Sequence, residues 1–411
     1  MAMAMAIEFQ NPFRPGAGHV PPYLAGRKEE TKEFERLLKQ PVLLENLVLT
    51  GLRGVGKTVL LDTLKPIAQQ QNWLWVGTDL SESTSVSEET IATRLITDLA
   101  TVTSGIVLNQ VTRASIGFGA AKKTVDQTLS YDVLLDVYER TPGLVADKLK
   151  AVLLLAWSAI TSTKHPARGL VFAYDEAQNL ADQAIKQQYP LSLLLDVFQS
   201  LQKQNIRFLL LLTGLPTLFP KLVDARTFAE RMFRVVFLRK LSESDSREAV
   251  LKPISDAACP VRLSEASVKR IVQMSGGYPY FIQFIGREVY DAFLANTRAT
   301  GKVGAIPSDA ITRKLDNDFF AGRWSRVTDR QRELLLVIAR LENRDDEFTV
   351  QEIVDKSKQE LAKGFSSSHV NQMLATLGVA GLVYKNRHGK YSFAVPLFGQ
   401  FVLRQMADAT A

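Results

Sequence analysis

Short apolar runs alternate with longer segments of helical periodicity through the first 240 residues. The run at residues 208–213 lacks the alternation of a half-exposed strand, which is typical of a strand buried on both faces. Strands are predicted at residues 46–50, 73–78, 169–174, 208–213 and 235–238. Helical patterns occupy residues 27–39, 59–71, 181–205 and most of 81–165, where a polar interruption at 112–123 predicts a hairpin or loop. This alternation predicts a parallel sheet covered by helices.

The pattern becomes helical after residue 241. Ser242 and Ser264 stand where helix N-caps are expected, and Gly276-Gly277 ends a helix. Further helices are predicted at residues 328–341, with Thr328 as cap, and at 349–356 and 366–378. Residues 381–395 then predict two strands around a turn at His388-Gly389. Three helices followed by a hairpin resemble a winged helix-turn-helix.

Composition narrows the function classes. The chain has 411 residues, a net charge of +7, one cysteine and four histidines. One cysteine cannot form an internal disulfide, and this content disfavours a zinc site. No apolar run reaches the length of a membrane span, and no secretory signal is recognisable at the start, so a cytoplasmic protein without membrane association is expected. The mildly basic charge is compatible with a nucleic-acid partner.

The first predicted strand leads into Gly51-Leu-Arg-Gly-Val-Gly-Lys-Thr58, which fits the P-loop pattern. Backbone N–H groups of such a loop surround the phosphates of a nucleotide, and its lysine, here Lys57, reaches the β- and γ-phosphates. The hydroxyl of Thr58 would bind Mg²⁺. The residues expected to bind nucleotide here are Gly51, Gly54, Val55, Gly56, Lys57, Thr58 and Val59.

Two carboxylates and a threonine follow the ends of the third and fourth strands. Asp175 is predicted to hold Mg²⁺, and Glu176 to activate the attacking water. Thr213 is placed between the carboxylates and the γ-phosphate; a strand-capping role is the alternative. Acidic pairs after strands are common, so this interpretation depends on the P-loop.

These motifs, in this order, resemble the AAA+ ATPases, most closely the origin-recognition initiators, and the related STAND ATPases. The resemblance implies that Tyr23 and Leu24 contact adenine, that Asp175 and Glu176 form the Walker B motif, and that Thr213 is sensor 1. Arg231 is near the arginine-finger position, with Arg226 and Arg234 as rivals. Pro279 follows the glycines where many AAA+ members carry an arginine; it matches STAND proteins, and Arg287 is further along.

The C-terminal unit leaves two interpretations open. If it binds double-stranded DNA, residues 366–372 would face the major groove and Lys385, Arg387 and Lys390 would meet phosphates. However, that helix has no Lys or Arg, and residues 322–411 hold 13 basic and 10 acidic residues. A protein partner is the alternative. Arg113, Lys122 and Lys123 would be a second contact or a solvated loop.

The sequence thus predicts an α/β P-loop NTPase with a parallel sheet, followed by a helical lid and a winged helix-turn-helix. The predicted domains are residues 1–240, 241–322 and 323–411. The expected function is an ATP- and Mg²⁺-dependent switch that forms a homo-oligomer with ATP and engages DNA. A STAND-type signalling ATPase, whose winged helix contacts protein, is the alternative. A dedicated enzyme such as a nuclease is disfavoured because the sequence shows no second set of catalytic residues.

Overall fold

The computed structural model describes residues 11–16, 18–113, 123–387 and 389–408, which fall into two compact units. The sheet unit consists of Lys28–Thr50 and Leu60–Phe237. The lid unit consists of Met1–Arg27, Gly51–Val59 and Leu238–Ala411. The chain therefore passes from one unit to the other on each side of the P-loop. The domain boundaries expected after residues 240 and 322 stay predictions.

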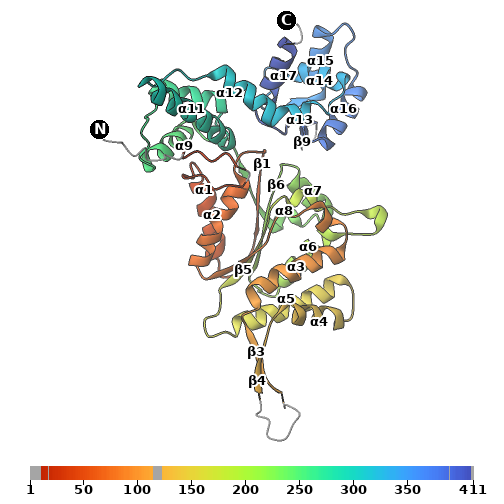
Figure 1. The fold of residues 1–411 in the computed structure, drawn as a ribbon. Helices are drawn as coiled ribbons and strands as arrows, with labels where there is room; N and C mark the ends of the chain where they lie inside the picture. Colours follow the sequence, from red (N-terminus) through yellow and green to blue (C-terminus); the bar gives the residue numbers. More distant parts are fainter. Residues whose placement is uncertain (1–10, 17, 114–122, 388, 409–411) are drawn as a thin grey trace, which may run out of the picture. The chain divides into compact units, whose positions relative to one another are not determined.

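The centre of the sheet unit is a five-stranded sheet in the order β2-β5-β6-β1-β7 (Figure 1). The pairs β1–β6, β5–β6 and β2–β5 are parallel. Every residue of β1, β5 and β6 is buried, as the continuous apolar runs predicted. The strands are β1 (Asn46–Gly51), β2 (Trp73–Val76), β5 (Gly169–Tyr174), β6 (Phe208–Gly214) and β7 (Phe233–Leu238). All five predicted strands are confirmed, with small shifts of their ends.

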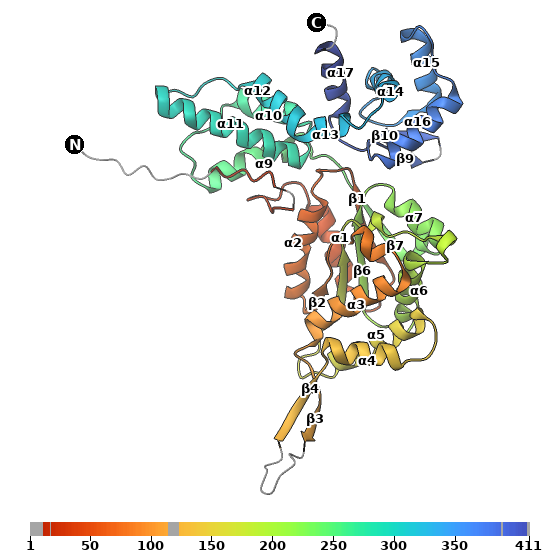
Figure 2. The same ribbon diagram turned by 45° about the vertical axis from the view of Figure 1, so that its right-hand side comes forward.

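Helices lie on both faces of this sheet (Figures 1 and 2). One face carries α1 (Lys28–Lys39) and α2 (Lys57–Gln70), and the other carries α3 (Glu88–Thr103), α5 (Val145–Thr161) and α6 (Pro190–Gln202). The apolar core forms between the sheet and the second group. The remaining helices are α4 (Tyr131–Arg140), α7 (Leu218–Ala225) and α8 (Ala229–Met232), with short 3₁₀ turns at Glu82–Ser85, Ala177–Asn179 and Ala184–Lys186. The α/β fold class is confirmed.

The polar interruption between α3 and α4 is a β-hairpin. Strands β3 (Val107–Arg113) and β4 (Lys123–Thr128) pair in antiparallel register and project from the sheet unit (Figures 1 and 2). The predicted hairpin is thus confirmed, although its strands extend beyond residues 112–123. Lys122 lies outside the described residues.

The helix predicted at residues 181–205 is wrong in its first third. Helix α6 begins only at Pro190, a residue suited to the first helical position because it has no N–H to satisfy. Asp182 accepts hydrogen bonds from the N–H groups of Leu191 (2.9 Å) and Ser192 (3.1 Å). The segment between folds back through a bridge from Gln183 to Gln188. Apolar periodicity alone did not reveal this side-chain cap.

A close approach of two strands predicts one severe mutation. Gly77, just after β2, has φ +134°, and a Cβ there would lie 1.7 Å from the carbonyl oxygen of Ala173 in β5. We expect Gly77→Ala to lower the free energy of unfolding by roughly 3 kcal/mol. Chemical denaturation measures this loss. Gly105→Ala is the control, because no atom lies within 4 Å of its added Cβ; equal stability of the two variants would contradict the packing described.

After β7, the lid unit is mainly helical and contains one small sheet near its C-terminal end. Its first helices are α9 (Glu243–Asp256), α10 (Glu265–Ser275), α11 (Pro279–Thr300), α12 (Ser308–Leu315), a π-helical turn at Asp316–Phe320 and α13 (Ala321–Trp324). Ser242 and Ser264 cap α9 and α10, and Gly276 ends α10 in a left-handed conformation. These three predictions are confirmed.

The C-terminal part shares its apolar core with the preceding helices. It consists of α14 (Asp329–Ala339), β8 (Phe348–Thr349), α15 (Val350–Glu360), α16 (Ser367–Val379), β9 (Val383–Arg387), β10 (Lys390–Phe393) and α17 (Phe398–Asp408). The strands form an antiparallel sheet in the order β8-β10-β9. Thr328 caps α14 as predicted. His388, in the expected turn, lies outside the described residues. No helix in the described part of the chain is long and apolar enough to cross a membrane.

Candidate functional site

The P-loop of the lid unit has the backbone of a phosphate-binding loop. Gly54 and Gly56 have φ of +76° and +90°, values that side chains with a Cβ rarely adopt. Lys57 follows at the first position of α2 and is 8% exposed. Its ammonium group donates hydrogen bonds to the carbonyl oxygens of Gly51 and Leu52, both at 3.0 Å. The lysine is therefore folded back over its own loop.

Two further contacts hold this loop within the lid unit. The buried guanidinium of Arg27 donates to the carbonyl oxygens of Val55 (2.8 Å) and Arg239 (2.9 Å). The N–H of Tyr280, in the first turn of α11, donates to the carbonyl oxygen of Gly54 (3.1 Å). The sequence reasoning missed the role of Arg27; its position directly after a Gly, ahead of a charged helix, was the only signal.

The segment expected to contact adenine lies in the same unit. Tyr23 and Leu24 are half-buried, and Tyr23 packs against the lid core. The Tyr23 hydroxyl donates to a carboxylate oxygen of Glu248 in α9 (2.6 Å). An adenine contact stays a prediction for both residues. Pro279 is the first residue of α11, next to the Tyr280 contact with the loop. Arg287 pairs with Asp291 at 3.8 Å.

In the sheet unit, the ends of β5 and β6 bring together the predicted acidic and polar residues. Asp175 directly follows β5, and Thr213 is the penultimate residue of β6. Both are buried, and the Thr213 hydroxyl donates to Oδ1 of Asp175. The same oxygen accepts the backbone N–H of Glu176 (2.7 Å). Thr213 thus fixes the orientation of the Asp175 carboxylate; a sensor role for Thr213 stays a prediction.

The strand register also relates this edge to the P-loop. Thr50 in β1 pairs with Gly214 in β6, and Tyr174 in β5 pairs with Leu212. Gly51, the first residue of the loop, directly follows Thr50 in the chain. β1 leads into the loop, β5 leads into the carboxylates, and β6, which contains the threonine, lies between these two strands. All three strands end at the same edge of the sheet, where ligands bind in open α/β sheets.

Two carboxylates that the sequence reasoning missed add to the negative charge near Asp175. Partial desolvation, and then the charge of Asp175, raise the pKa of Asp62. The same two causes, with Glu176 and Asp62 as further contributors, raise the pKa of Asp79. Asp62 stands four residues after Thr58 on α2, a spacing that puts both on one helical face. In the described part of the chain, however, these carboxylates do not form a group of three or more ligands that could by itself hold a metal ion.

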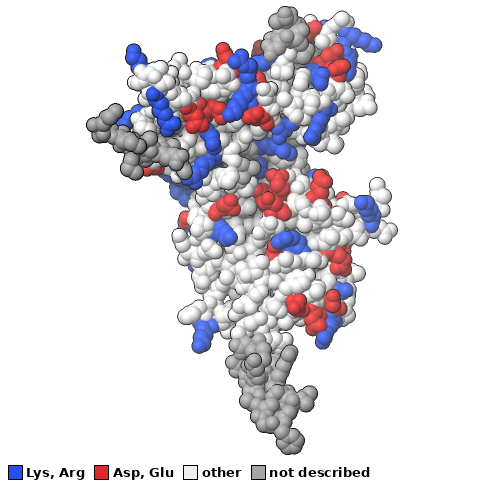
Figure 3. Space-filling model, in the orientation of Figure 1, with Lys and Arg blue, Asp and Glu red and all other residues white. Residues whose placement is uncertain are grey.

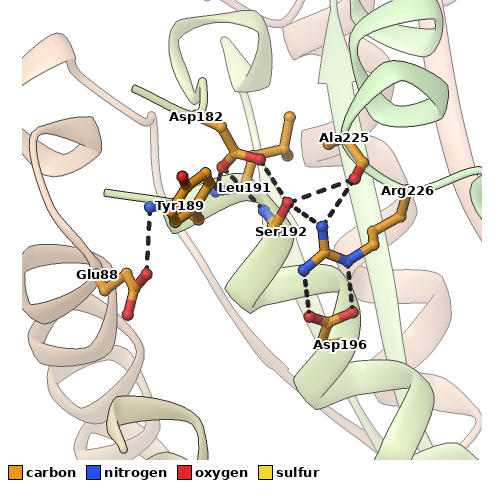
Figure 4. Close-up of polar contacts among 8 residues, drawn as sticks. All are labelled: Glu88, Asp182, Tyr189, Leu191, Ser192, Asp196, Ala225 and Arg226. Atoms are coloured by element: carbon orange, nitrogen blue, oxygen red, sulfur yellow. Dashed lines mark hydrogen bonds and ion pairs between the residues drawn. The ribbon is translucent and has the colours of Figure 1, made fainter. Parts of the chain in front are cut away.

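The three candidate finger arginines differ in their contacts. Arg226 makes two hydrogen bonds to the carboxylate of Asp196 (2.9 and 2.7 Å) and one to the Ser192 hydroxyl (2.7 Å), as Figure 4 shows. Arg234 pairs with Glu33 at 2.9 Å. Arg231, in α8, is exposed and makes no ion pair or side-chain hydrogen bond with any residue that the structure describes. Among the three, Arg231 has the side chain most available to another molecule.

Comparison with known families gives two matches. Residues 23–223 match the AAA ATPase domain family, and residues 317–402 match a family described as a domain of unknown function (DUF8462). The part of the chain that contains the P-loop, Asp175 and Thr213 is therefore similar to an AAA ATPase domain. A search of curated proteins gave no match.

Solved structures support the fold over nearly the whole chain. The Walker-type ATPase PABY2304 of Pyrococcus abyssi is similar with a TM-score of 0.57 and 16% identity, covering 92% of this chain and 96% of that chain. The ORC2 protein of Aeropyrum pernix, in its ADP form, gives 0.51 and 14%, covering 96% and 98%. At such identities the likeness concerns the fold alone. It agrees with the fold that the initiator resemblance implied.

Proposed function

We propose that the chain binds ATP with Mg²⁺ at the P-loop and hydrolyses it with the residues at the ends of β5 and β6. The observation that carries this proposal is the buried pair Asp175–Thr213 at the ends of β5 and β6, because β6 lies between β5 and β1, whose end leads into the loop. Lys57 and the loop N–H groups would bind the phosphates, and Tyr23 and Leu24 the adenine. Thr58 and Asp175 would hold Mg²⁺, which neutralises charge on the phosphates.

Each protein group has a distinct task in this proposal. The Lys57 ammonium exchanges its hydrogen bonds with Gly51 and Leu52 for the phosphate oxygens. The Glu176 carboxylate orients the attacking water and accepts its proton. Thr213 keeps Asp175 in a fixed orientation, so that little reorganisation is needed during the reaction. The hydrogen bond from Tyr280 to Gly54 links the P-loop to the start of α11, where Pro279 lies. A change in the loop on nucleotide binding would therefore also move α11.

We further propose that the nucleotide state controls binding of duplex DNA by a C-terminal winged helix. The solvent face of α16 carries Ser367, Ser368, Asn371, Gln372 and Thr376, all exposed. Short amides and hydroxyls of this kind can read base edges in the major groove. Lys385 in β9 is exposed and suited to a phosphate contact, with Arg387 and Lys390 on the same hairpin.

Two observations favour the alternative of a signalling ATPase with a protein partner. Val379, at the end of α16, is 93% exposed, and α16 contains no Lys or Arg. On the face drawn in Figure 3, Lys and Arg are interspersed with Asp and Glu. DNA binding by α16 and the β9–β10 hairpin would therefore depend on few phosphate contacts, and its affinity should fall only slowly as the salt concentration rises.

The retention of labelled duplex DNA with ATP, with ADP and without nucleotide distinguishes the two functions. The DNA-coupled switch predicts tighter retention of DNA with ATP. It also predicts that Lys385→Ala lowers the affinity for DNA of every sequence, and that the slope of log affinity against log salt concentration decreases in magnitude by about one. Lys358→Ala, on α15, is the matched control because that lysine is also exposed. Retention of DNA that depends neither on the nucleotide nor on Lys385 would favour the protein-partner alternative.

Arg231 is proposed as the arginine finger of an ATP-bound homo-oligomer. Because it would act on the nucleotide of a neighbouring subunit, we expect Arg231→Ala to lower turnover on the order of 1000-fold or more while each chain still binds ATP. Turnover per subunit of the wild type should rise with protein concentration, and that rise should vanish in the variant. Arg239→Ala, another exposed arginine, is the control. Unchanged turnover in Arg231→Ala would remove this residue from the site.

A further inference from the structure

Gln178 connects the Glu176 carboxylate to the end of β6. Its side-chain amide N–H donates a hydrogen bond to Oε2 of Glu176. Its side-chain oxygen accepts the backbone N–H of Leu215 (3.0 Å), directly after β6. Its main-chain carbonyl accepts a hydrogen bond from the ammonium group of Lys221 in α7 (2.7 Å). Gln178 is thus anchored on two sides and makes its third contact with Glu176.

These anchors determine which end of the amide meets Glu176. The N–H of Leu215 is a donor only, so it requires the amide oxygen of Gln178. The amide nitrogen must then point the other way, toward a carboxylate that can only accept. A glutamate at position 178 could not satisfy both partners, because its carboxylate would place negative charge against that of Glu176. The position therefore favours an amide for a chemical reason.

Gly214, the last residue of β6, leaves room for this arrangement. A Cβ at this position would lie 2.6 Å from the side-chain oxygen of Gln178 and 2.9 Å from Cδ2 of Leu218. A side chain at 214 would consequently displace the Gln178 amide from Leu215. The neighbouring Thr213 hydroxyl holds Asp175, so two residues of one strand end position two successive carboxylates.

Glu176 itself needs this support. Its φ of 51° and ψ of 32° lie in the left-handed region, which is uncommon for a residue with a Cβ. Its side chain is exposed, so packing does not fix the direction of the carboxylate. The hydrogen bonds from its own N–H to Asp175 and from Gln178 to its carboxylate are what orient it. Such conformations are retained where the surroundings hold them, often at functional sites.

We propose that Gln178 is a positioning residue for the general base. It holds the Glu176 carboxylate in a fixed position relative to Asp175, because the end of β6 anchors Gln178 through Leu215 and Asp175 through Thr213. This inference rests on the proposed function, in which Glu176 accepts the proton of the attacking water. Gln178 contacts neither nucleotide nor water in this proposal. Its effect is therefore confined to the rate of the chemical step.

Steady-state ATP turnover of Gln178→Ala tests the proposal. We expect kcat to fall roughly tenfold while the KM for ATP changes by less than about twofold, because the base loses its orientation and the phosphate site is untouched. Gly214→Ala should likewise lower kcat and leave the KM for ATP nearly unchanged, since it displaces the same amide. Gln204→Ala, an exposed glutamine at the end of α6, and Gly105→Ala are the matched controls and should behave as wild type.

Gln178→Glu removes the donor and keeps the length of the side chain. Its carboxylate cannot donate a hydrogen bond to Glu176, so kcat should fall at least as far as in Gln178→Ala while the KM for ATP stays within about twofold. Wild-type turnover by Gln178→Glu would overturn the proposal.

The outcomes separate this inference from the proposed function. Equal turnover by wild type and Glu176→Gln would remove Glu176 as the base, and the proposed function with it. A large loss in Glu176→Gln together with wild-type turnover in Gln178→Ala would overturn the role of Gln178 alone. A gain in turnover in Gln178→Ala would also overturn it, because the amide would then restrain the base. Binding of ATP, measured for each variant, confirms that the variant is folded.

Discussion

Glu176→Gln should reduce ATP turnover roughly 100- to 10,000-fold, the range that general acid–base catalysis contributes. The substitution preserves the size of the side chain and replaces only the group that can accept a proton. Asp175, Thr213 and their hydrogen bond are untouched, so the proposed metal ligand keeps its orientation. The loss should consequently appear in kcat, measured by phosphate release at saturating ATP.

Nucleotide binding provides the control for this variant. Glu176 is exposed and, in the described structure, its carboxylate accepts a hydrogen bond from Gln178, so its removal should leave the Kd for ATP within a few fold. The variant should also retain ATP unhydrolysed and so stabilise any ATP-dependent assembly. Turnover within threefold of wild type would show that another group activates the water.

Lys57→Ala should abolish measurable ATP binding. The ammonium group is nearly buried and already satisfied by two carbonyl oxygens of its own loop, which makes it a preformed partner for phosphate oxygens. A hydrogen bond to a charged group contributes about 1.5–3 kcal/mol, and loss of one such contact to each of two phosphates weakens binding by ~100-fold or more. Isothermal titration with ATP and Mg²⁺ measures the effect.

The matched control is Lys39→Ala at the exposed end of α1, which removes an equal charge from the sheet unit. It should bind ATP like the wild type. Because Lys57 also bonds within the loop, thermal unfolding without nucleotide should accompany the titration. Intact ATP binding in Lys57→Ala would contradict the assignment of the P-loop.

The sequence was most informative where one physical requirement dominates a segment. Strands buried on both faces are continuously apolar, so β1, β5 and β6 were predicted almost to the residue. Helix caps such as Ser242 and Ser264 were recognisable because a hydroxyl must satisfy free N–H groups at a helix start. The P-loop followed from the spacing of glycines and a lysine.

Contacts between distant segments could not be predicted in this way. The cap of α6 comes from Asp182, eight residues before Pro190, and the P-loop is held by Arg27, whose partners are at Val55 and Arg239. Gln178 is two residues from Glu176, yet its anchor is Leu215, directly after β6. Each depends on tertiary neighbours that periodicity and motif spacing do not encode. The difference between Arg231, which is exposed, and its rivals, which pair with carboxylates, likewise emerged only from the structure.

The most direct test of the DNA-coupled switch is ATP turnover by the wild type and by Glu176→Gln, with and without duplex DNA, at two salt concentrations. The DNA-coupled switch predicts wild-type turnover that DNA stimulates, a stimulation that weakens at the higher salt concentration, and little turnover by Glu176→Gln under any condition. Slow wild-type turnover that DNA does not change, with tightly retained nucleotide, would contradict coupling to DNA and would favour a protein partner.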